Sequence, residues 1–179
     1  MAKLDLHYVD EIIGARHEQH GGAQGAPLKI DGHRVGAALN RSCIVMLSSL
    51  LQSFVEEVFQ EAAKRKFAAI AADEAAFNAY WKQMKGWGNP SEENIRTLFL
   101  KLGVPDVFSG LSWKNRATPD VRRKLNELNL LRNQIAHGAR GLKLNNQAYS
   151  MSLVRATEFR DFALQFGERF EGHVTLLLP

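Results

Sequence analysis

The chain is poor in cysteine and in continuous apolar sequence. Cys43 is the only cysteine among 179 residues, so an intrachain disulfide is excluded and a reducing, cytoplasmic location is expected. It lies in an apolar helical stretch, where we expect it to be a small buried hydrophobic residue. No apolar run approaches the roughly 20 residues that a membrane-spanning helix needs. The first residues, MAKLDLHYVDEII, place acids and a histidine within the apolar pattern, which is unlike a signal peptide. We therefore expect a cytoplasmic protein that does not insert into a membrane.

Several sequence motifs of catalysis and metal binding are also missing. There is no P-loop, no G-x-S-x-G nucleophile elbow, no H-E-x-x-H motif and no zinc-type set of cysteines. His17 and His20 have a spacing that could suggest a metal site, but no cysteine or carboxylate cluster accompanies them. Surface histidines explain this pair better, so we expect neither a metal nor a cofactor.

Five prolines and fourteen glycines leave long stretches of the chain free for helices. Apolar residues recur at the i, i+3, i+4, i+7 spacing of amphipathic helices. This pattern predicts an all-α fold, an antiparallel bundle of four to five main helices, as a single domain over residues 1–179. The expected helices cover residues 3–19, 31–72, 73–85, about 91–103, 118–138 and 146–171. Ser91 and Thr118 are the expected N-caps of the fourth and fifth of these helices. The helix at 118–138 is expected to pack on the long helix at 31–72. The N-terminal helix and the apolar, β-prone tail at residues 173–178 are expected to be extensions of the bundle.

The longest of these segments, residues 31–72, would span roughly 60 Å as one helix at about 1.5 Å per residue. That length exceeds the width of a small domain, so the helix must bend, protrude or bury part of its apolar stripe against a second subunit. Glu56 and Glu57 lie in its middle and are candidate partners for a buried arginine. The alternative is that both are solvated carboxylates on a helix face.

Residues 125–138, LNELNLLRNQIAHG, form the segment with the clearest chemistry. Arg132 projects from the margin of its apolar face, where an arginine is costly unless something pairs with it. Asn133 and His137 lie on the opposite side, about 40° apart around the helix. Gly138 follows the last apolar residue, as a left-handed cap does. An arginine, a polar amide and a histidine in this arrangement can hold and cleave a phosphodiester.

The positive charge of the chain is concentrated around this segment. The net charge of the whole chain is +4. Residues 113–143 contain eight cations and two acids, which gives +6, so the remaining residues sum to −2. Such a concentration favours an anionic ligand such as nucleic acid, and the alternative is a solvated basic helix face. The candidate RNA-binding residues are Arg122, Arg123, Lys124, Arg140 and Lys143.

One further residue has two interpretations. Trp87 lies between two glycines, where an indole can stack on a nucleic acid base or, as is more common for tryptophan in such turns, fill a gap in the core.

The run RNQIAH at residues 132–137 matches the R-(polar)-x-x-x-H signature of HEPN domains, all-α proteins that include many metal-independent ribonucleases. Residues 40–57 resemble the second conserved block of the RiboL-PSP-HEPN branch, and residues 89–90 and 98–104 resemble its middle region. Together these pieces cover residues 31–138. The branch commonly has an acidic residue where Gln52 stands, which leaves the partner of Arg132 open.

The resemblance implies a metal-independent endoribonuclease that cleaves RNA by attack of the 2′-hydroxyl on the adjacent phosphate. His137 would transfer the proton, Arg132 would bind the non-bridging phosphate oxygens, and Asn133 would orient the imidazole or the phosphate. One histidine cannot be both acid and base in one step, so a homodimer with a composite site is expected. The branch also implies a toxin or phage-defence effector, for which a cognate antitoxin protein is a candidate partner.

Two less specific interpretations remain open. In the first, Arg132 is a buried arginine satisfied by a glutamate, and His137 is a residue at a helix end without a catalytic role. In the second, the chain is a catalytically silent HEPN module that binds a nucleotide or a partner protein.

Overall fold

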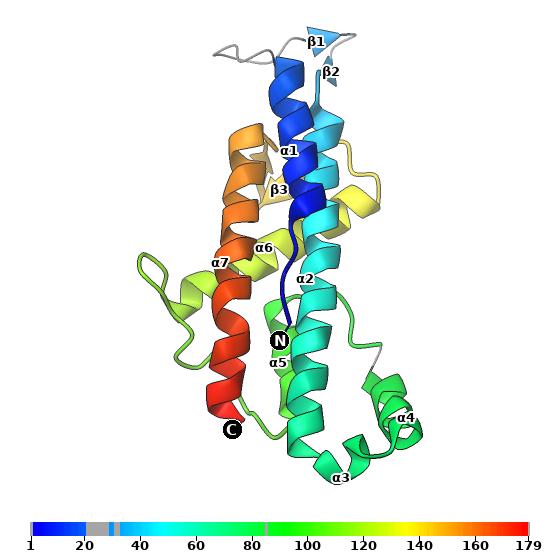
Figure 1. Ribbon diagram of the computed structural model, residues 1–179. Helices are drawn as coiled ribbons and strands as arrows, with labels where there is room; N and C mark the ends of the chain where they lie inside the picture. Colours follow the sequence, from blue (N-terminus) through cyan, green and yellow to red (C-terminus); the bar gives the residue numbers. More distant parts are fainter. Residues whose placement is uncertain (1, 21–28, 31–32, 85, 179) are drawn as a thin grey trace.

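The computed structural model of the chain describes residues 2–20, 29–30, 33–84 and 86–178. Within these ranges the chain is mostly helical, with two short antiparallel hairpins, and the predicted all-α class is confirmed (Figure 1). The helices are α1 (His7–His20), α2 (Ala37–Lys66), α3 (Ala68–Ala71), α4 (Glu74–Met84), α5 (Glu92–Leu100), α6 (Thr118–Ala136) and α7 (Leu153–Leu177). The strands are β1 (Lys29–Ile30), β2 (His33–Arg34), β3 (Leu142–Leu144) and β4 (Gln147–Tyr149).

The directions of the long helices differ in part from the expected antiparallel arrangement. α1 runs opposite to α2, as expected, but α7 runs parallel to α2 (Figure 1). At one end of the α2–α7 pair the Asn40 side chain donates to the Met151 carbonyl (3.0 Å), and at the other end Arg65 contacts Thr175. The reason lies in α6, which crosses the bundle obliquely and returns the chain to the end at which α2 begins (Figure 1).

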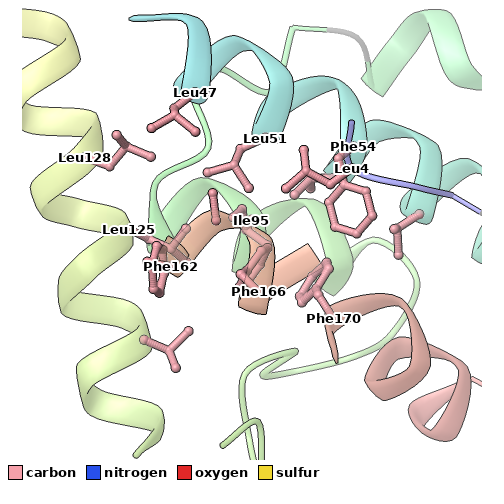
Figure 2. Packing of buried hydrophobic residues seen from close by; sticks show 14 of the residues in the cluster. Leu4, Leu47, Leu51, Phe54, Ile95, Leu125, Leu128, Phe162, Phe166 and Phe170 are labelled. Atoms are coloured by element: carbon pink, nitrogen blue, oxygen red, sulfur yellow. The ribbon is translucent and has the colours of Figure 1, made fainter. Parts of the chain in front are cut away.

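The core forms where α2, α5, α6 and α7 meet. Leu47 and Leu51 of α2 point toward Leu125 and Leu128 of α6, and Phe166 of α7 lies in the same cluster (Figure 2). These side chains are fully buried, and each contributes about 1.5–3 kcal/mol by leaving water. The prediction that α6 packs on the long helix is confirmed. The fully buried aromatic residues of this core are Phe59, Phe99, Phe108, Phe159, Phe162, Phe166 and Phe170.

The long helix is shorter than predicted at both ends. Its expected start at Asp31 lies outside the described residues, and α2 begins only after Gly36, whose φ of 75° is left-handed. Its last residue is Lys66, because Phe67 leaves the helix and packs its ring against Tyr80 of α4, 5.7 Å between centroids. At about 1.5 Å per residue, the 30 residues of α2 span roughly 45 Å.

The outer face of α2 does not carry the uncovered apolar stripe that was expected. Its large apolar residues are buried or half-buried, and its solvent-exposed positions are small or charged. Among the described residues, the large exposed hydrophobic side chains all belong to other elements. The exposed residues of α2 are Ala38, Ser42, Ser49, Ser53, Glu57, Lys64, Arg65 and Lys66.

By length and composition alone, α2 could cross a membrane, since an 18-residue window reaches a mean hydropathy of 1.4. Half of that window is buried inside the bundle. The core helix of a globular protein meets the same criteria, so this property is weak support for a membrane span.

The chain between α6 and α7 contains a hairpin, although the sequence pattern predicted a loop and the start of the last helix there. Asn145 and Asn146 both have positive φ, 51° and 61°, and connect β3 to β4 as a two-residue turn. α7 therefore begins later than expected, after Ser152, whose hydroxyl accepts from the Arg155 amide. The tail, expected to be β-prone, is helical to Leu177 because Val174 is fully buried against the core.

The predicted N-caps have different outcomes. Ser91 caps α5 as predicted, since its hydroxyl accepts from the Asn94 amide at 3.2 Å. Thr118, predicted to cap α6, is instead its first residue and donates its hydroxyl to the Leu111 carbonyl at 3.0 Å. The capping position belongs to Ala117, which provides no side-chain hydrogen bond.

Cys43 lies inside α2 and is fully buried, as predicted for a small hydrophobic residue. Burial, with a smaller contribution from the negative charge of Asp10, raises the pKa of its thiol to about 11. The side chain therefore stays protonated near neutral pH and serves the core.

We expect Phe170→Ala to lower the free energy of unfolding by about 3–5 kcal/mol, because it leaves a cavity among tightly packed rings. The Phe170 ring stacks on Phe166 at 4.7 Å and meets Phe99 edge-on at 5.5 Å. Urea unfolding followed by circular dichroism measures the change. Leu176→Ala, at a position 82% exposed on the same helix, is the control and should change stability by less than about 0.5 kcal/mol. Equal losses in both variants would contradict this account of the core.

Candidate functional site

The C-terminal end of α6 is closed by a complete Schellman motif. Gly138 has a φ of 72° and donates its amide to the Ile135 carbonyl at 3.0 Å. The Ala139 amide donates to the Gln134 carbonyl at 2.9 Å. The predicted glycine cap is confirmed. It leaves His137 as the last residue before the chain turns, with its side chain exposed to solvent.

The segment that follows this cap is held from two sides. The Gln134 side chain both donates to the Lys143 carbonyl and accepts from the Lys143 amide, each at 2.8 Å, like a neighbouring strand. From α2, the Arg41 guanidinium donates to the carbonyls of Ala139 (2.8 Å) and Arg140 (2.7 Å). These contacts fix the backbone beyond His137 relative to both α2 and α6.

Arg132 and Asn133 form a hydrogen-bonded group with a third residue, Asn89. The Asn133 side-chain oxygen accepts from the Arg132 guanidinium at 3.1 Å and from the side-chain NH₂ of Asn89 at 3.0 Å. All three side chains are partly buried. Because its oxygen already has two donors, the Asn133 carboxamide is held in one orientation, and its NH₂ group has no acceptor among the described residues. It is therefore available to a ligand.

The loop that carries Asn89 is fixed between α2 and α6. Trp87 is partly buried and donates its indole N–H to Glu56 at 3.0 Å, while Gln52 contacts the same carboxylate at 3.4 Å. The structure thus favours a packing role for Trp87 over base stacking. Glu56 was a candidate partner of Arg132, but in the described residues neither it nor the exposed Glu57 pairs with that arginine. The carboxylate of Glu56 positions the loop instead.

The polar face of α6 contacts both the Asn89 loop and the start of α5. The Asn126 side-chain oxygen accepts from the Glu92 backbone amide at 3.1 Å, about two turns before Asn133. Between them, the Asn129 side-chain oxygen is buried without a hydrogen-bond partner among the described residues. Asn133 thus holds the loop against the helix, and Asn126 holds the start of α5.

Arg122 is a structural residue, which differs from its expected role as a free RNA-binding cation. Its guanidinium pairs with Glu92 of α5 at 2.7 Å and with Asp106, and it lies over the Phe108 ring at 5.4 Å. Two carboxylates offset its charge, and its side chain is only 29% exposed. It joins α6 to α5 and to the loop that follows.

Arg123 and Lys124 are also paired with acids. Arg123 contacts Asp120 at 2.7 Å and Glu127 at 3.9 Å, one on each side along the helix. Lys124 reaches Glu127 at 3.5 Å and places its ammonium 3.8 Å from the centre of the Phe159 ring, at 15% exposure. Only Arg123 remains well exposed. The first half of α6 therefore carries much less free positive charge than the sequence indicated.

Arg140 and Lys143, by contrast, are exposed beyond the end of α6, and the described residues give neither side chain an ion pair. Two further arginines lie nearby that sequence reasoning did not select, Arg34 of β2 and Arg41 of α2. Arg41 belongs to the 40–57 block that resembles the RiboL-PSP-HEPN branch, and Asn89 belongs to the segment at 89–90 that resembles the middle region of that branch. That resemblance was the one sequence signal for either residue.

In the part of the chain that the structure describes, no three His, Cys, Asp or Glu side chains gather as metal ligands. His17 is exposed on α1, and the side chain of His20 lies outside the described residues.

We expect Asn89→Ala to lower the melting temperature by about 2–4 °C, because it removes one partly buried hydrogen bond worth about 1 kcal/mol. Differential scanning calorimetry provides the measurement. Asn78→Ala is the control, since Asn78 is exposed on α4 and alanine suits a helix. An Asn89 variant that melts no earlier than the control would show that this hydrogen bond does not hold the loop.

The chain was also compared with known proteins. A family model described as RiboL-PSP-HEPN matches residues 63–175, which is more than half of the chain. The match includes α6 and the Asn89 loop, but it begins after the end of the 40–57 block. Comparisons with curated proteins and with solved structures gave no match. The arrangement of α6, its RNxxxH motif and the family match together show that the chain belongs to the RiboL-PSP-HEPN family.

Proposed function

We propose that the protein is a metal-independent endoribonuclease whose reaction takes place at the C-terminal end of α6. The observation that carries this proposal is the arrangement of three motif side chains. Arg132 and Asn133 are held together by Asn89, and His137 is exposed at the helix end one turn later. Family membership supports the same reaction class, since HEPN domains are often ribonucleases.

The chemistry needs only groups that this end of the helix can supply. RNA carries its own nucleophile, the 2′-hydroxyl, so cleavage requires proton transfer and stabilisation of the charged phosphorane. His137 takes or gives the proton. Arg132 keeps donors beyond the one bonded to Asn133, and these bind the non-bridging oxygens. The free NH₂ of Asn133 orients the phosphate. The products are a 2′,3′-cyclic phosphate and a 5′-hydroxyl.

A homodimer completes the site in this proposal, because one histidine cannot be acid and base in the same step. The face for such contact is the outer side of α6. Leu130 is 45% exposed there and lies about 20° from His137 around the helix. A two-fold axis near this face brings the two His137 side chains to one cleft. The outer face of α2 offers small and charged residues, so it is the poorer candidate for the interface.

The biological role that fits this activity is a cytoplasmic toxin or phage-defence effector. A nuclease that acts on cellular RNA must be held inactive until it is needed, and a cognate antitoxin protein would cover the exposed end of α6. The family supports this role only in the general sense that HEPN domains are often ribonucleases.

His137→Ala and Arg132→Ala should each reduce RNA cleavage by about 10²–10⁴-fold, because they remove proton transfer or phosphate binding in the transition state. The assay is incubation with total cellular RNA in EDTA, followed by analysis of the product ends. His17→Ala, an exposed histidine on α1, is the matched control and should cleave normally. Circular dichroism checks the fold of each variant.

Full cleavage by the His137 variant would end the catalytic assignment. A wild-type chain that cleaves no RNA but binds nucleotide or protein would support the silent HEPN module instead.

The composite site predicts a dominant-negative effect. When wild-type and His137→Ala chains are co-expressed in equal amounts, only wild-type dimers have both histidines, so activity should fall to about one quarter of the all-wild-type value. Independent sites would retain about one half. Tagged chains and a cleavage assay at fixed total protein distinguish these outcomes.

Sedimentation tests the proposed face directly. Leu130→Glu should shift the protein toward monomer, while Leu176→Glu, at an equally apolar exposed position on α7, should not. A wild-type monomer with full activity would show that His137 works with water or with another residue of its own chain.

A further inference from the structure

An open pocket of about 860 Å³ lies where the C-terminal end of α6 meets the N-terminal end of α2. Its volume is within the usual range of ligand sites, roughly 300–1,000 Å³. One wall is the segment that begins at Gly138, the residue after His137. The lining residues are Arg34, Gly36, Ala37, Ala38, Arg41, Gly138, Ala139 and Arg140.

Three of these lining residues are arginines, and the described part of the lining contains no acid. Arg41 donates to the carbonyls of Ala139 and Arg140, and Arg34 contacts the Ser150 hydroxyl at 3.3 Å. These acceptors are neutral, so the positive charges of both guanidinium groups remain. The Arg140 side chain has no ion pair among the described residues. The pocket is therefore strongly positive.

The start of α2 adds hydrogen-bond donors to the same pocket. Gly36, the N-cap residue, has no side chain to accept from the first amides, and no acid lies in the first turn. Ala37 and Ala38 follow it in the lining. The free N–H groups at the start of a 30-residue helix favour an anion, and here the arginines lie beside them.

A fourth arginine stands directly behind the pocket. Arg16 of α1 is almost fully buried, with a relative exposure of 3%. Its Nε has no hydrogen-bond partner among the described residues. Its side chain lies so close to Gly36 that a Cβ there would be 2.3 Å from that Nε. This proximity explains why a glycine occupies the position, and it places another positive charge against the wall of the pocket.

From these observations we infer that the pocket binds a backbone phosphate of the RNA strand, next to the phosphate that is cleaved at His137. The inference rests on the proposed ribonuclease function. Because Gly138 lines the pocket, a strand whose scissile phosphate lies at His137 passes over it with its neighbouring nucleotide. Among the described residues, the lining has no aromatic ring on which a base could stack, so the pocket is proposed to bind phosphate without a base preference.

The double variant Arg34→Gln/Arg140→Gln tests this site, because both side chains are exposed and Arg41, which holds the loop, is left intact. The probe is a short 2′-O-methyl RNA oligonucleotide, which has no free 2′-hydroxyl and cannot be cleaved. Fluorescence anisotropy at several salt concentrations gives the dissociation constant and its salt dependence. Arg65→Gln, an exposed arginine at the other end of α2, is the matched control.

We expect the double variant to bind the probe more weakly, by about fivefold at 0.1 M salt for each arginine that no longer neutralises a phosphate. The slope of log affinity against log salt concentration should become shallower by about 0.7 per arginine. The control should bind like the wild type. In the cleavage assay with natural RNA, the double variant should raise KM and leave kcat largely unchanged, because it does not alter the groups at the reacting phosphate.

The outcomes separate this inference from the proposed function. Unchanged affinity and salt slope in the double variant, with cleavage intact, would overturn the phosphate site alone. A wild-type protein that binds the probe through Arg34 and Arg140 but cleaves no RNA would overturn the nuclease and keep the site. A mononucleotide that binds as tightly as the oligonucleotide would show a nucleotide pocket and overturn the backbone assignment.

Discussion

The packing of α2 against α6 is the constraint on which the rest of the structure depends. Leu47 and Leu51 meet Leu125 and Leu128 across this interface, and the rings of α7 close it from the third side (Figure 2). Because the buried leucines sit on one face of α6, the other side of the helix turns its asparagines toward the Asn89 loop and the start of α5, and it leaves His137 exposed. The apolar pattern of the helix therefore sets the direction in which its polar groups point.

The free positive charge of this molecule lies where the basic side chains have no acidic partner. In the first half of α6, Arg122 is neutralised by acids of α5 and the following loop, and Lys124 lies on the Phe159 ring. Beyond the end of α6, Arg140 joins Arg34 and Arg41, whose hydrogen-bond acceptors among the described residues are all neutral. A single basic stretch in the sequence thus separates into a structural half and a half that is available to an anion.

Sequence alone predicted what depends on local pattern and missed what depends on distant contacts. The helical class, the Ser91 cap and the Gly138 cap follow from residues close together in the chain, and all three are confirmed. The end of α2 was misplaced because it is set by a ring contact of Phe67 with another helix. The motif located the candidate site, but not Asn89, which lies 44 residues before its partner Asn133. Nothing local in the sequence marks such a pair.

α2 also links the two sides of the candidate site, at two positions about four turns apart. At one of them, Arg41 holds the carbonyls that follow His137, and at the other, Glu56 holds Trp87 of the loop that carries Asn89. The His137 imidazole and the Arg132–Asn133 group both belong to α6, but the segments around them are held by side chains of α2. A rotation of α6 against α2 would strain both sets of hydrogen bonds together. The site is therefore held as a unit, and under the proposed function an RNA strand that contacts both the pocket and His137 would meet groups whose relative positions are already set.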